Sequence, residues 1–401
     1  MRKIIKTFDK QKIFLATLLF LFSLIFFFIP SFSAIRPFNY VNLGLVGLFC
    51  ALVLLYTLLY KKLVIDWFFV ATLIFNLTVL VSNIVNRDAT QTTTYLSLSI
   101  FAFFSYQLFL DEKIKTIMKF AMFASFMAFS FYFCFYYRTE LLHFSNTRIG
   151  DHFDNLNTVG YYFLYGFVIS LSFIKRKNPI SWVTSVASFL FLFLLFRTGS
   201  RSALLIALIV FLIFFWLFLN GIKVFLKIII FLSLVLTIVL AFVVLGKITN
   251  GALLERLIDF FNLFSSDSNT DYSTINRIEL VFQSLSLFLR RPLFGWGNNV
   301  FFFFFSERLF AHNNITELLC DFGIFACLSF EFLLFKPVKS IIKKRHNDCL
   351  PLLLLFSVFL VQFFYVNSQL KYDWILISLI ASSCIIQNNS ISRAVFFEVN
   401  I

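Results

Sequence analysis

The chain alternates long apolar runs with short polar connections. A membrane-spanning helix needs about 20 mainly apolar residues, because lipid offers the backbone no hydrogen-bond partners. This criterion predicts an all-α polytopic membrane protein with one membrane domain over residues 1–401 and a single long extracytoplasmic loop at 247–313. Twelve spans are predicted, at residues 13–29, 41–59, 64–82, 92–110, 114–137, 158–174, 180–196, 202–219, 224–246, 314–335, 350–366 and 373–387.

The first apolar run has some features of a secretory signal. Basic residues precede it, and the sequence SFSA at residues 31–34 resembles a cleavage site. Its apolar run is longer than a usual signal core, and eleven further spans follow. We therefore expect an uncleaved first helix.

Composition excludes a soluble globular protein of this length. Hydrophobic residues make up 60% of the chain and charged residues 13%, with a mean hydropathy of +0.90. The six cysteines form no CxxC pair and have no His at zinc spacing. They are therefore expected to be small buried hydrophobic residues and not a metal or disulfide framework.

The distribution of Lys and Arg between the loops predicts the orientation, because short cytoplasmic loops carry an excess of both. With the N-terminus inside, the cytoplasmic segments carry 21 of the 34 basic residues and the opposite side carries 13. Six of those 13 lie in the long loop, where the rule is weaker. We expect both termini in the cytoplasm and the long loop on the outer face.

The two predicted faces also differ in the type of cation. The inner side has 17 Lys and 4 Arg, whereas the outer side has 11 Arg and 2 Lys. A planar guanidinium can bind phosphate through two parallel hydrogen bonds, while Lys suffices as a topology signal. The outer face is therefore expected to bind phosphate groups, unless these charges only pair with Asp and Glu. The net charge of +14 comes mostly from the cytoplasmic Lys residues and requires no nucleic-acid partner.

One candidate site is the tight connection at residues 197–205, RTGSRSALL. Gly199 permits a turn, and Ser200 can cap the helix that begins at Arg201. The helix dipole disfavours a cation at a helix N-terminus, so Arg201 indicates that an anion binds nearby. Arg197 is a weaker candidate for the same anion.

Three further polar sites lie on the predicted outer face. They are the helix start near Asn157, which follows Arg148, Asp151, His152 and Asp154; the arginines Arg277, Arg290 and Arg291; and His312.

Apolar positions at steps of three and four residues predict an amphipathic helix at residues 275–289, ended by Pro292. We expect this helix to lie on or slightly in the outer leaflet, with Arg277 in its first turn. The PLFGWGNN turn that follows presents Trp296, either as a membrane-interface anchor or as a stacking face for a sugar. The segment Phe301–Phe305 is expected to return toward lipid.

Three of these segments, in order, carry a resemblance to a known family. They are RTGSRSALL, then NRIELVFQSLSLFLRRPLFGWGNNVF, then AHNNITELLCDFGIFACL. Together they resemble the O-antigen ligase and polymerase superfamily, which has an SRxALL-type helix start, an Arg-containing helix ending in a Pro-Leu-x-Gly-x-Gly turn, and a His-Asn-x-x-x-Glu helix start. The Arg148–Gly160 stretch matches more loosely, and the first half of the chain matches only in hydropathy. The implied fold is a GT-C-like membrane architecture.

The resemblance implies an inverting membrane glycosyltransferase that needs no metal or other cofactor. Its donor would be an oligosaccharide linked through pyrophosphate to undecaprenol, in the bacterial cytoplasmic membrane, with flippase and chain-length regulator proteins as partners. Arginines in a partly dry site can stabilise a departing pyrophosphate. The implied catalytic residues are Arg201 and Arg277 on the phosphates and His312 as general base, since an imidazole pKa of about 6.5 suits proton abstraction. Substrate-binding candidates are Arg197, Arg291, Asn157, Glu317 and Trp296. Arg197 and Arg291 are the weaker candidates for phosphate, since they could instead contact lipid headgroups.

Two of these residues have a second interpretation. His312 could instead cap the helix that follows it. Glu317 lies five residues beyond His312, about 140° around an ideal helix. We therefore expect Glu317 to pair with an arginine and not with His312.

Several functions remain open from the sequence. A polymerase would build O-antigen or capsule by extending lipid-linked chains; a ligase would move the finished glycan to a lipid A core or another surface acceptor. We favour the polymerase. A flippase would be expected to place ionisable residues at mid-membrane and to show paired broken helices, yet Asp66, Glu331 and Asp373 lie near the ends of predicted spans and no repeated halves are visible. A metal-dependent transferase could use Asp151, His152 and Asp154 as ligands. A protease is disfavoured, because neither GxSxG nor HExxH occurs.

Overall fold

The computed structural model describes residues 2–31, 36–61, 63–87, 92–142, 149, 156–175, 180–233, 236, 272–298, 300, 304, 311–344, 348–366, 368, 370–384 and 395–396. Nearly all of these residues are helical. The helices are α1 (Arg2–Ser31), α2 (Arg36–Tyr60), α3 (Trp67–Asn86), α4 (Thr92–Phe109), α5 (Glu112–Tyr136), α6 (Arg138–Leu142), α7 (Leu156–Ser172), α8 (Ile180–Thr198), α9 (Arg201–Phe218), α12 (Tyr272–Arg290), α14 (Asn314–Phe322), α15 (Ile324–Phe335), α16 (Val338–Lys344), α17 (Leu350–Val361) and α18 (Lys371–Ser382). A short antiparallel pair joins β1 (Val64–Ile65) to β2 (Val395–Phe396).

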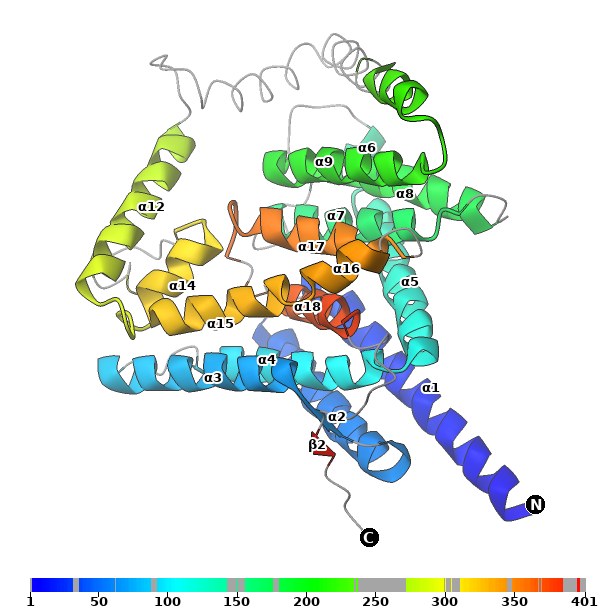
Figure 1. Cartoon of the computed structure of the whole chain (residues 1–401), viewed down its shortest axis with the longest axis horizontal. Coiled ribbons are helices and arrows are strands. Elements are labelled where there is room, and N and C mark those ends of the chain that lie inside the picture. Colours follow the sequence, from blue (N-terminus) through cyan, green and yellow to red (C-terminus); the bar gives the residue numbers. More distant parts are fainter. Residues whose placement is uncertain are drawn as a thin grey trace.

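The long helices form a bundle, and one helix crosses its end. Helices α3, α4, α9, α15 and α17 run roughly parallel across Figure 1, while α12 lies across their left ends. Helix α12 covers residues 272–290, so the amphipathic helix predicted at residues 275–289 is confirmed as a helix.

The bundle has the lengths and composition of a membrane protein. Within the described residues, five helical stretches are long and apolar enough to cross a membrane: Leu43–Tyr60, Trp67–Asn86, Glu112–Tyr136, Ile180–Thr198 and Arg201–Phe218. Four shorter apolar helices accompany them: Gln11–Phe27, Val224–Ser233, Leu350–Val361 and Tyr372–Ser382. A mostly helical membrane protein is therefore confirmed, and the count of twelve spans stays a prediction.

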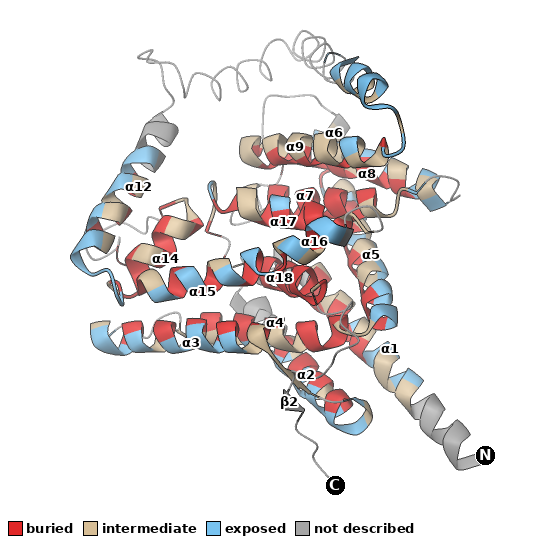
Figure 2. Cartoon of the chain, in the orientation of Figure 1, coloured by how far each residue is buried: buried red, intermediate tan, exposed pale blue. Residues whose placement is uncertain are grey.

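Helix α18 is the centre of the bundle. Every side chain from Tyr372 to Ser383 is buried, and Figure 2 shows α18 in red, enclosed by the surrounding helices. The indole of Trp374 packs against Phe75 of α3 and Phe330 of α15, with ring centroids 5.3 and 5.4 Å apart. The helices around α18 instead expose large apolar side chains, such as Trp182 on α8 with 80% exposure. An apolar outer surface around a packed centre is the arrangement that lipid favours.

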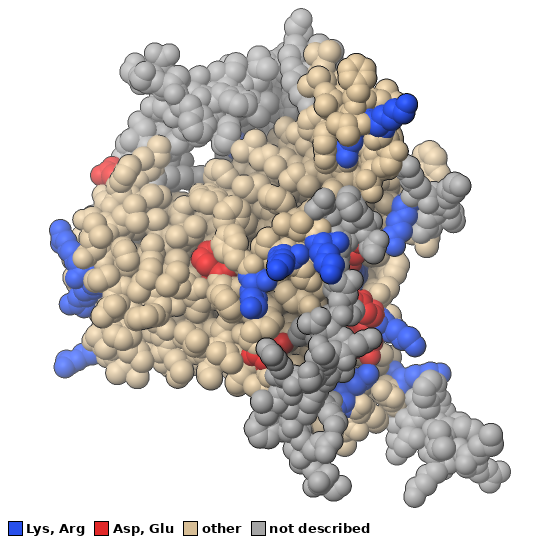
Figure 3. All heavy atoms as spheres, viewed as in Figure 1, with Lys and Arg blue, Asp and Glu red and all other residues tan. Residues whose placement is uncertain are grey.

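Basic side chains are unevenly distributed over the face seen in Figure 3. Some lie at the left edge, on the side where α12 lies, and others are spread over the centre and the right of this face, with a largely uncharged surface between the left edge and the centre. The three ion pairs formed by described residues all use Lys and involve α5 or the residue before it: Lys61–Asp111, Lys115–Glu112 and Lys119–Asp348.

The helix predicted at residues 314–335 is in fact two helices. Gly323 interrupts it with a φ of +82°, a conformation that glycine adopts without steric cost. In a continuous helix, the carbonyls of Cys320 and Asp321 would accept from the N–H groups four residues later. They accept instead from the N–H groups of Trp296 (3.0 Å) and Gly297 (2.8 Å). The predicted single helix was wrong because the turn after α12 supplies these replacement partners.

The turn after α12 also supplies a hydrogen-bond acceptor for the start of α15. The N–H of Ile324, which begins α15, donates to the carbonyl of Pro292 (2.9 Å), and the Ser82 hydroxyl of α3 also donates to the carbonyl of Asp321 (2.9 Å). The turn at residues 292–297 is thereby part of the helix bundle.

Candidate functional site

The turn between α8 and α9 is shaped by contact with α7. Gly199 has a φ of +67°. Ser200 is the N-cap residue of α9, as predicted, but its side chain makes no capping hydrogen bond. Ser200 packs instead on Gly160, where an added Cβ would lie 2.5 Å from the Ser200 Cβ. This close approach directs the Ser200 side chain toward α7 and holds the start of α9 against the start of α7.

The two arginines of this turn have different environments. Arg197 is buried, and its Nη2 donates to the backbone carbonyl of Glu140 at 2.5 Å. Its own carbonyl accepts from the N–H of Ile149 at 3.2 Å. Arg201 is half-buried at the first position of α9. Arg197 therefore connects α8 to α6, whereas Arg201 lies at the helix start at which an anion is expected.

Helix α7 carries hydroxyl groups next to this turn. Asn157 and Thr158 are half-buried in its first turn. The hydroxyl of Tyr161 lies 2.7 Å from that of Ser202 on α9, and the hydroxyl of Thr158 lies 3.0 Å from that of Tyr365. The rings of Tyr161 and Tyr365 are 5.5 Å apart. The starts of α7 and α9 thus meet the segment that follows α17.

That segment, residues 362–370, connects α7 and α9 to α14. The amide of Asn314 is held from both sides: its Nδ2 donates to Gln362 Oε1 (3.1 Å), and its Oδ1 accepts from the N–H of Ser368 (2.9 Å). The backbone N–H of Asn314 donates to the Gln362 carbonyl (2.7 Å). Sequence reasoning did not include this segment, although the polar run NSQLK at residues 367–371 was a signal that could have found it.

His312 sits in a fixed backbone position just before α14. Its φ is +52°, which is uncommon for a residue other than glycine. Asn313 is the N-cap, and its side chain accepts from the N–H of Thr316 at 3.1 Å. Glu317 is buried, and its Oε2 accepts from the N–H of Ala311 at 2.7 Å. The residues on both sides of the histidine are therefore held by side chains of α14 or its cap.

These contacts identify the cap of α14 and the partner of Glu317. The residue that caps α14 is Asn313, so the capping interpretation of His312 was wrong. Among the described residues, the partner of Glu317 is a backbone N–H and not the expected arginine. The carboxyl of Glu317 gives this buried N–H a hydrogen-bond acceptor.

Trp296 and Arg291 lie in the junction between α12 and α14. The guanidinium of Arg291 lies over the Trp296 ring, 3.9 Å from its centroid, and donates to Asn86 Oδ1 at 2.7 Å. The indole Nε1 of Trp296 donates to the carbonyl of Leu287 at 2.8 Å, and Phe304 packs edge-on at 5.0 Å. Trp296 thus has a structural role in this junction, and its predicted contact with a sugar stays a prediction.

Some predicted residues lie outside the described part of the chain. The backbone of Arg277 belongs to α12, but its side chain is not among the described ones. Arg148, Asp151, His152 and Asp154 lie wholly outside the described residues, as do Phe301–Phe305 apart from Phe304. In the described part, no three His, Cys, Asp or Glu side chains gather as a metal site would require.

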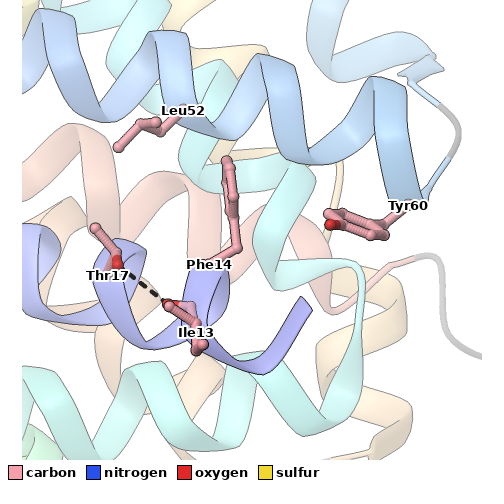
Figure 4. A pocket seen from close by; sticks show the side chains of 5 residues that line it. All are labelled: Ile13, Phe14, Thr17, Leu52 and Tyr60. Carbon is pink, nitrogen blue, oxygen red and sulfur yellow. Dashed lines mark hydrogen bonds between the residues drawn. The ribbon is translucent and has the colours of Figure 1, made fainter. Parts of the chain in front are cut away.

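A groove between α1 and α2 is separate from these residues. It is lined by Ile13, Phe14, Thr17, Leu52 and Tyr60 (Figure 4). The Thr17 hydroxyl donates to the Ile13 carbonyl at 3.0 Å, and neither α1 nor α2 carries a candidate site residue.

A series of contacts links the neighbours of two predicted site residues, Arg201 and His312. Arg201 and Ser202 begin α9, Tyr161 joins α9 to α7, and the segment at residues 362–370 joins α7 to the start of α14 beside His312. A base beside a helix N-cap and a cation at a second helix start can together accept a proton and hold an anion. This combination suits transfer of a group from a phosphorylated donor to a hydroxyl.

Comparison with known families supports the same kind of chemistry. Residues 186–330 match the family described as O-antigen ligase. The matched range contains every proposed catalytic or substrate-binding residue except Asn157. No curated protein matches the chain.

Proposed function

We propose that this chain, which belongs to the O-antigen ligase and polymerase superfamily through residues 186–330, is a metal-independent, inverting glycan polymerase. Its donor is an undecaprenyl-pyrophosphate-linked oligosaccharide, and its acceptor is a hydroxyl of the next lipid-linked repeat unit. The reaction takes place on the outer face of the bacterial cytoplasmic membrane and builds O-antigen or capsule. Both termini lie in the cytoplasm.

Each proposed step uses a named group. The acceptor hydroxyl attacks the anomeric carbon of the donor sugar, and His312 takes the hydroxyl proton. The bond between that carbon and the pyrophosphate oxygen breaks, and its electron pair leaves with the undecaprenyl pyrophosphate. Arg201 and Arg277 stabilise the negative charge of this leaving group, because preorganised guanidinium groups can hold phosphate oxygens without a metal ion.

The observation that carries the proposal is the position of His312. The backbone on both sides of His312 is fixed by Asn313 and Glu317. Contacts through Asn314 and Tyr365 connect this backbone to the start of α9, where Arg201 lies. A general base has to be held within hydrogen-bond reach of its substrate. Such fixed placement favours a catalytic role for His312 over a role as a surface residue.

The test uses purified protein in lipid nanodiscs. Lipid-linked repeat units are supplied alone, with EDTA present, and the products are separated by length. A ladder of lengthening chains supports the polymerase. Loss of activity that Mg²⁺ or Mn²⁺ restores would contradict the metal-independent mechanism.

A ligase is the second candidate, because the matched family is described by that activity. Adding a lipid A core acceptor to the same reaction distinguishes the two. A product that forms only with the added acceptor identifies a ligase. Translocation of labelled lipid-linked glycan with no transferred product would instead identify a flippase.

A further inference from the structure

Three exposed arginines lie together at the end of the bundle that α12 crosses. Arg87 is the C-cap residue of α3, Arg290 ends α12, and Arg291 follows it. The hydrogen bond from Arg291 to Asn86, the neighbour of Arg87, joins them into one surface, here called the arginine patch. Within the described part of the chain, none of the three forms an ion pair. Three neighbouring cations repel one another, so an anion would stabilise this surface.

The patch is partly built into the fold. Arg291 is oriented by Asn86 on one side and by the Trp296 ring on the other. The ring is itself fixed through its Nε1 bond to the Leu287 carbonyl, and Asn86 Nδ2 donates to the Ser82 carbonyl at 2.8 Å. A guanidinium held in this way loses little conformational entropy when it binds an anion.

The surroundings of the patch are apolar. Ile84 and Val85, in the last turn of α3, are 74% and 59% exposed, and Leu289, directly before Arg290, is 76% exposed. Leu293 and Phe294, in the turn, are exposed as well. An anion at this place therefore lies beside a surface that lipid chains would cover.

Helix α12 also has polar and apolar sides. At about 100° per residue, its side chains fall into three sectors. The buried sector contains Leu280, Ser284 and Leu287. The exposed apolar sector contains Ile278, Phe282 and Leu289. The polar sector, exposed or half-exposed, contains Glu279, Gln283 and Arg290. A helix with a protein side, an apolar side and a polar side fits the headgroup layer of a membrane.

We propose that the arginine patch binds the phosphoryl headgroup of an anionic phospholipid in the leaflet at this end of the bundle. The apolar sector of α12 and the last turn of α3 contact its acyl chains. The bound headgroup holds the turn at residues 292–297 against α3. In this proposal Arg291 binds a lipid headgroup and not the glycan donor for which the sequence made it a candidate, so the site does not depend on which glycan is moved.

The test places a photo-crosslinker beside the patch. p-Benzoylphenylalanine replaces Leu289 in protein held in nanodiscs of phosphatidylcholine with a minority of phosphatidylglycerol, and the lipid adducts are identified by mass spectrometry. We expect phosphatidylglycerol to be enriched in the adducts at least about fivefold over its share of the bilayer, since each arginine near the surface favours anionic lipid by about that factor.

Two variants and one control make the result specific. The enrichment should disappear in R87Q/R290Q/R291Q. It should fall in R87Q/R290Q, which leaves the Arg291 contacts intact. It should be unchanged in K336Q/K339Q/K343Q, which removes the same charge from exposed lysines of α15–α16.

Three outcomes would overturn the proposal. One is an adduct composition equal to that of the bilayer, and a second is crosslinking to a polypeptide. The third is displacement of the phosphatidylglycerol adduct by added undecaprenyl pyrophosphate, which would assign the patch to the glycan donor.

Discussion

The carboxylate of Glu317 accepts a hydrogen bond from the backbone N–H of Ala311 at 2.7 Å, across the residue that carries the proposed catalytic imidazole. Both groups are buried. A side chain in the first turn of α14 therefore fixes the backbone that enters His312.

This relationship predicts different effects for two substitutions of Glu317. Glu317→Ala removes the acceptor and leaves a buried N–H unpaired, which costs about 1–3 kcal/mol, and we expect turnover to fall about 10–100-fold as His312 loses its position. Glu317→Gln keeps an oxygen acceptor of the same size and should retain most turnover. Steady-state kinetics on lipid-linked substrate measures both. Equal inactivity of the two variants would show that the negative charge is required instead.

The contact between Gly160 and Ser200 predicts a steric effect. In Gly160→Ala the new Cβ would lie 2.5 Å from the Ser200 Cβ, so α7 and the start of α9 must separate, at a cost of about 1–3 kcal/mol. We expect a lower melting temperature in detergent and reduced transfer, since Arg201 begins α9. The double variant Gly160→Ala/Ser200→Gly removes the clashing atom and should recover most of the melting temperature. No recovery would place the damage elsewhere in α7.

The interruption at Gly323 predicts sensitivity to any side chain there. A Cβ on Gly323 would lie 2.2 Å from the Leu293 carbonyl oxygen, and the φ of +82° adds backbone strain. We expect Gly323→Ala to destabilise the protein by about 2–4 kcal/mol. Gly47→Ala, at a helical position with nothing within 4 Å of the added Cβ, is the control and should leave the melting temperature nearly unchanged. A Gly323→Ala protein as stable as the control would refute the described junction.

The proposed base predicts a loss of transfer without a loss of fold. His312→Ala should lower turnover about 10²–10⁴-fold near neutral pH, the usual contribution of general base catalysis. The melting temperature should change little, because Asn313 provides the cap of α14. Near-normal turnover would remove His312 from the mechanism.

The proposed phosphate contact of Arg277 predicts that charge alone is not enough. Arg277→Lys keeps the positive charge but loses the two parallel hydrogen bonds of the guanidinium. We expect it to lose most activity while the protein stays folded. Arg138→Lys, at an exposed arginine of α6, serves as the control for a general effect of replacing arginine. Full activity of Arg277→Lys would mean that Arg277 does not hold the phosphates in this way.

The helices were largely predictable because in lipid the backbone must satisfy its own hydrogen bonds, which requires long apolar helices. Long apolar runs gave the spans, and the three- and four-residue steps of Ile278, Phe282 and Leu285 gave α12. The break at Gly323 was not predictable, because it depends on partners about thirty residues earlier in the chain. Hydropathy cannot register such a distant exchange of hydrogen bonds.

The candidate site was predictable in part. Its charged residues could be chosen from their types and from the family motifs, but their partners could not. The pairing of Glu317 with the Ala311 N–H, the internal use of Arg197 and the participation of residues 362–370 all depend on tertiary contacts. The linear pattern contains no signal for the first two. For the third it contains the polar run NSQLK at residues 367–371, but not the residues that this segment contacts.

The junction at Gly323 also has a consequence for biosynthesis. A helix with an unpaired break is costly to place in lipid, because its free carbonyls have no water to bind. The N–H groups of Trp296 and Gly297, which satisfy that break, precede it in the chain and leave the ribosome first. The donors that the break needs are therefore already present when α14 and α15 emerge. We expect these two helices to insert without waiting for a later segment of the chain.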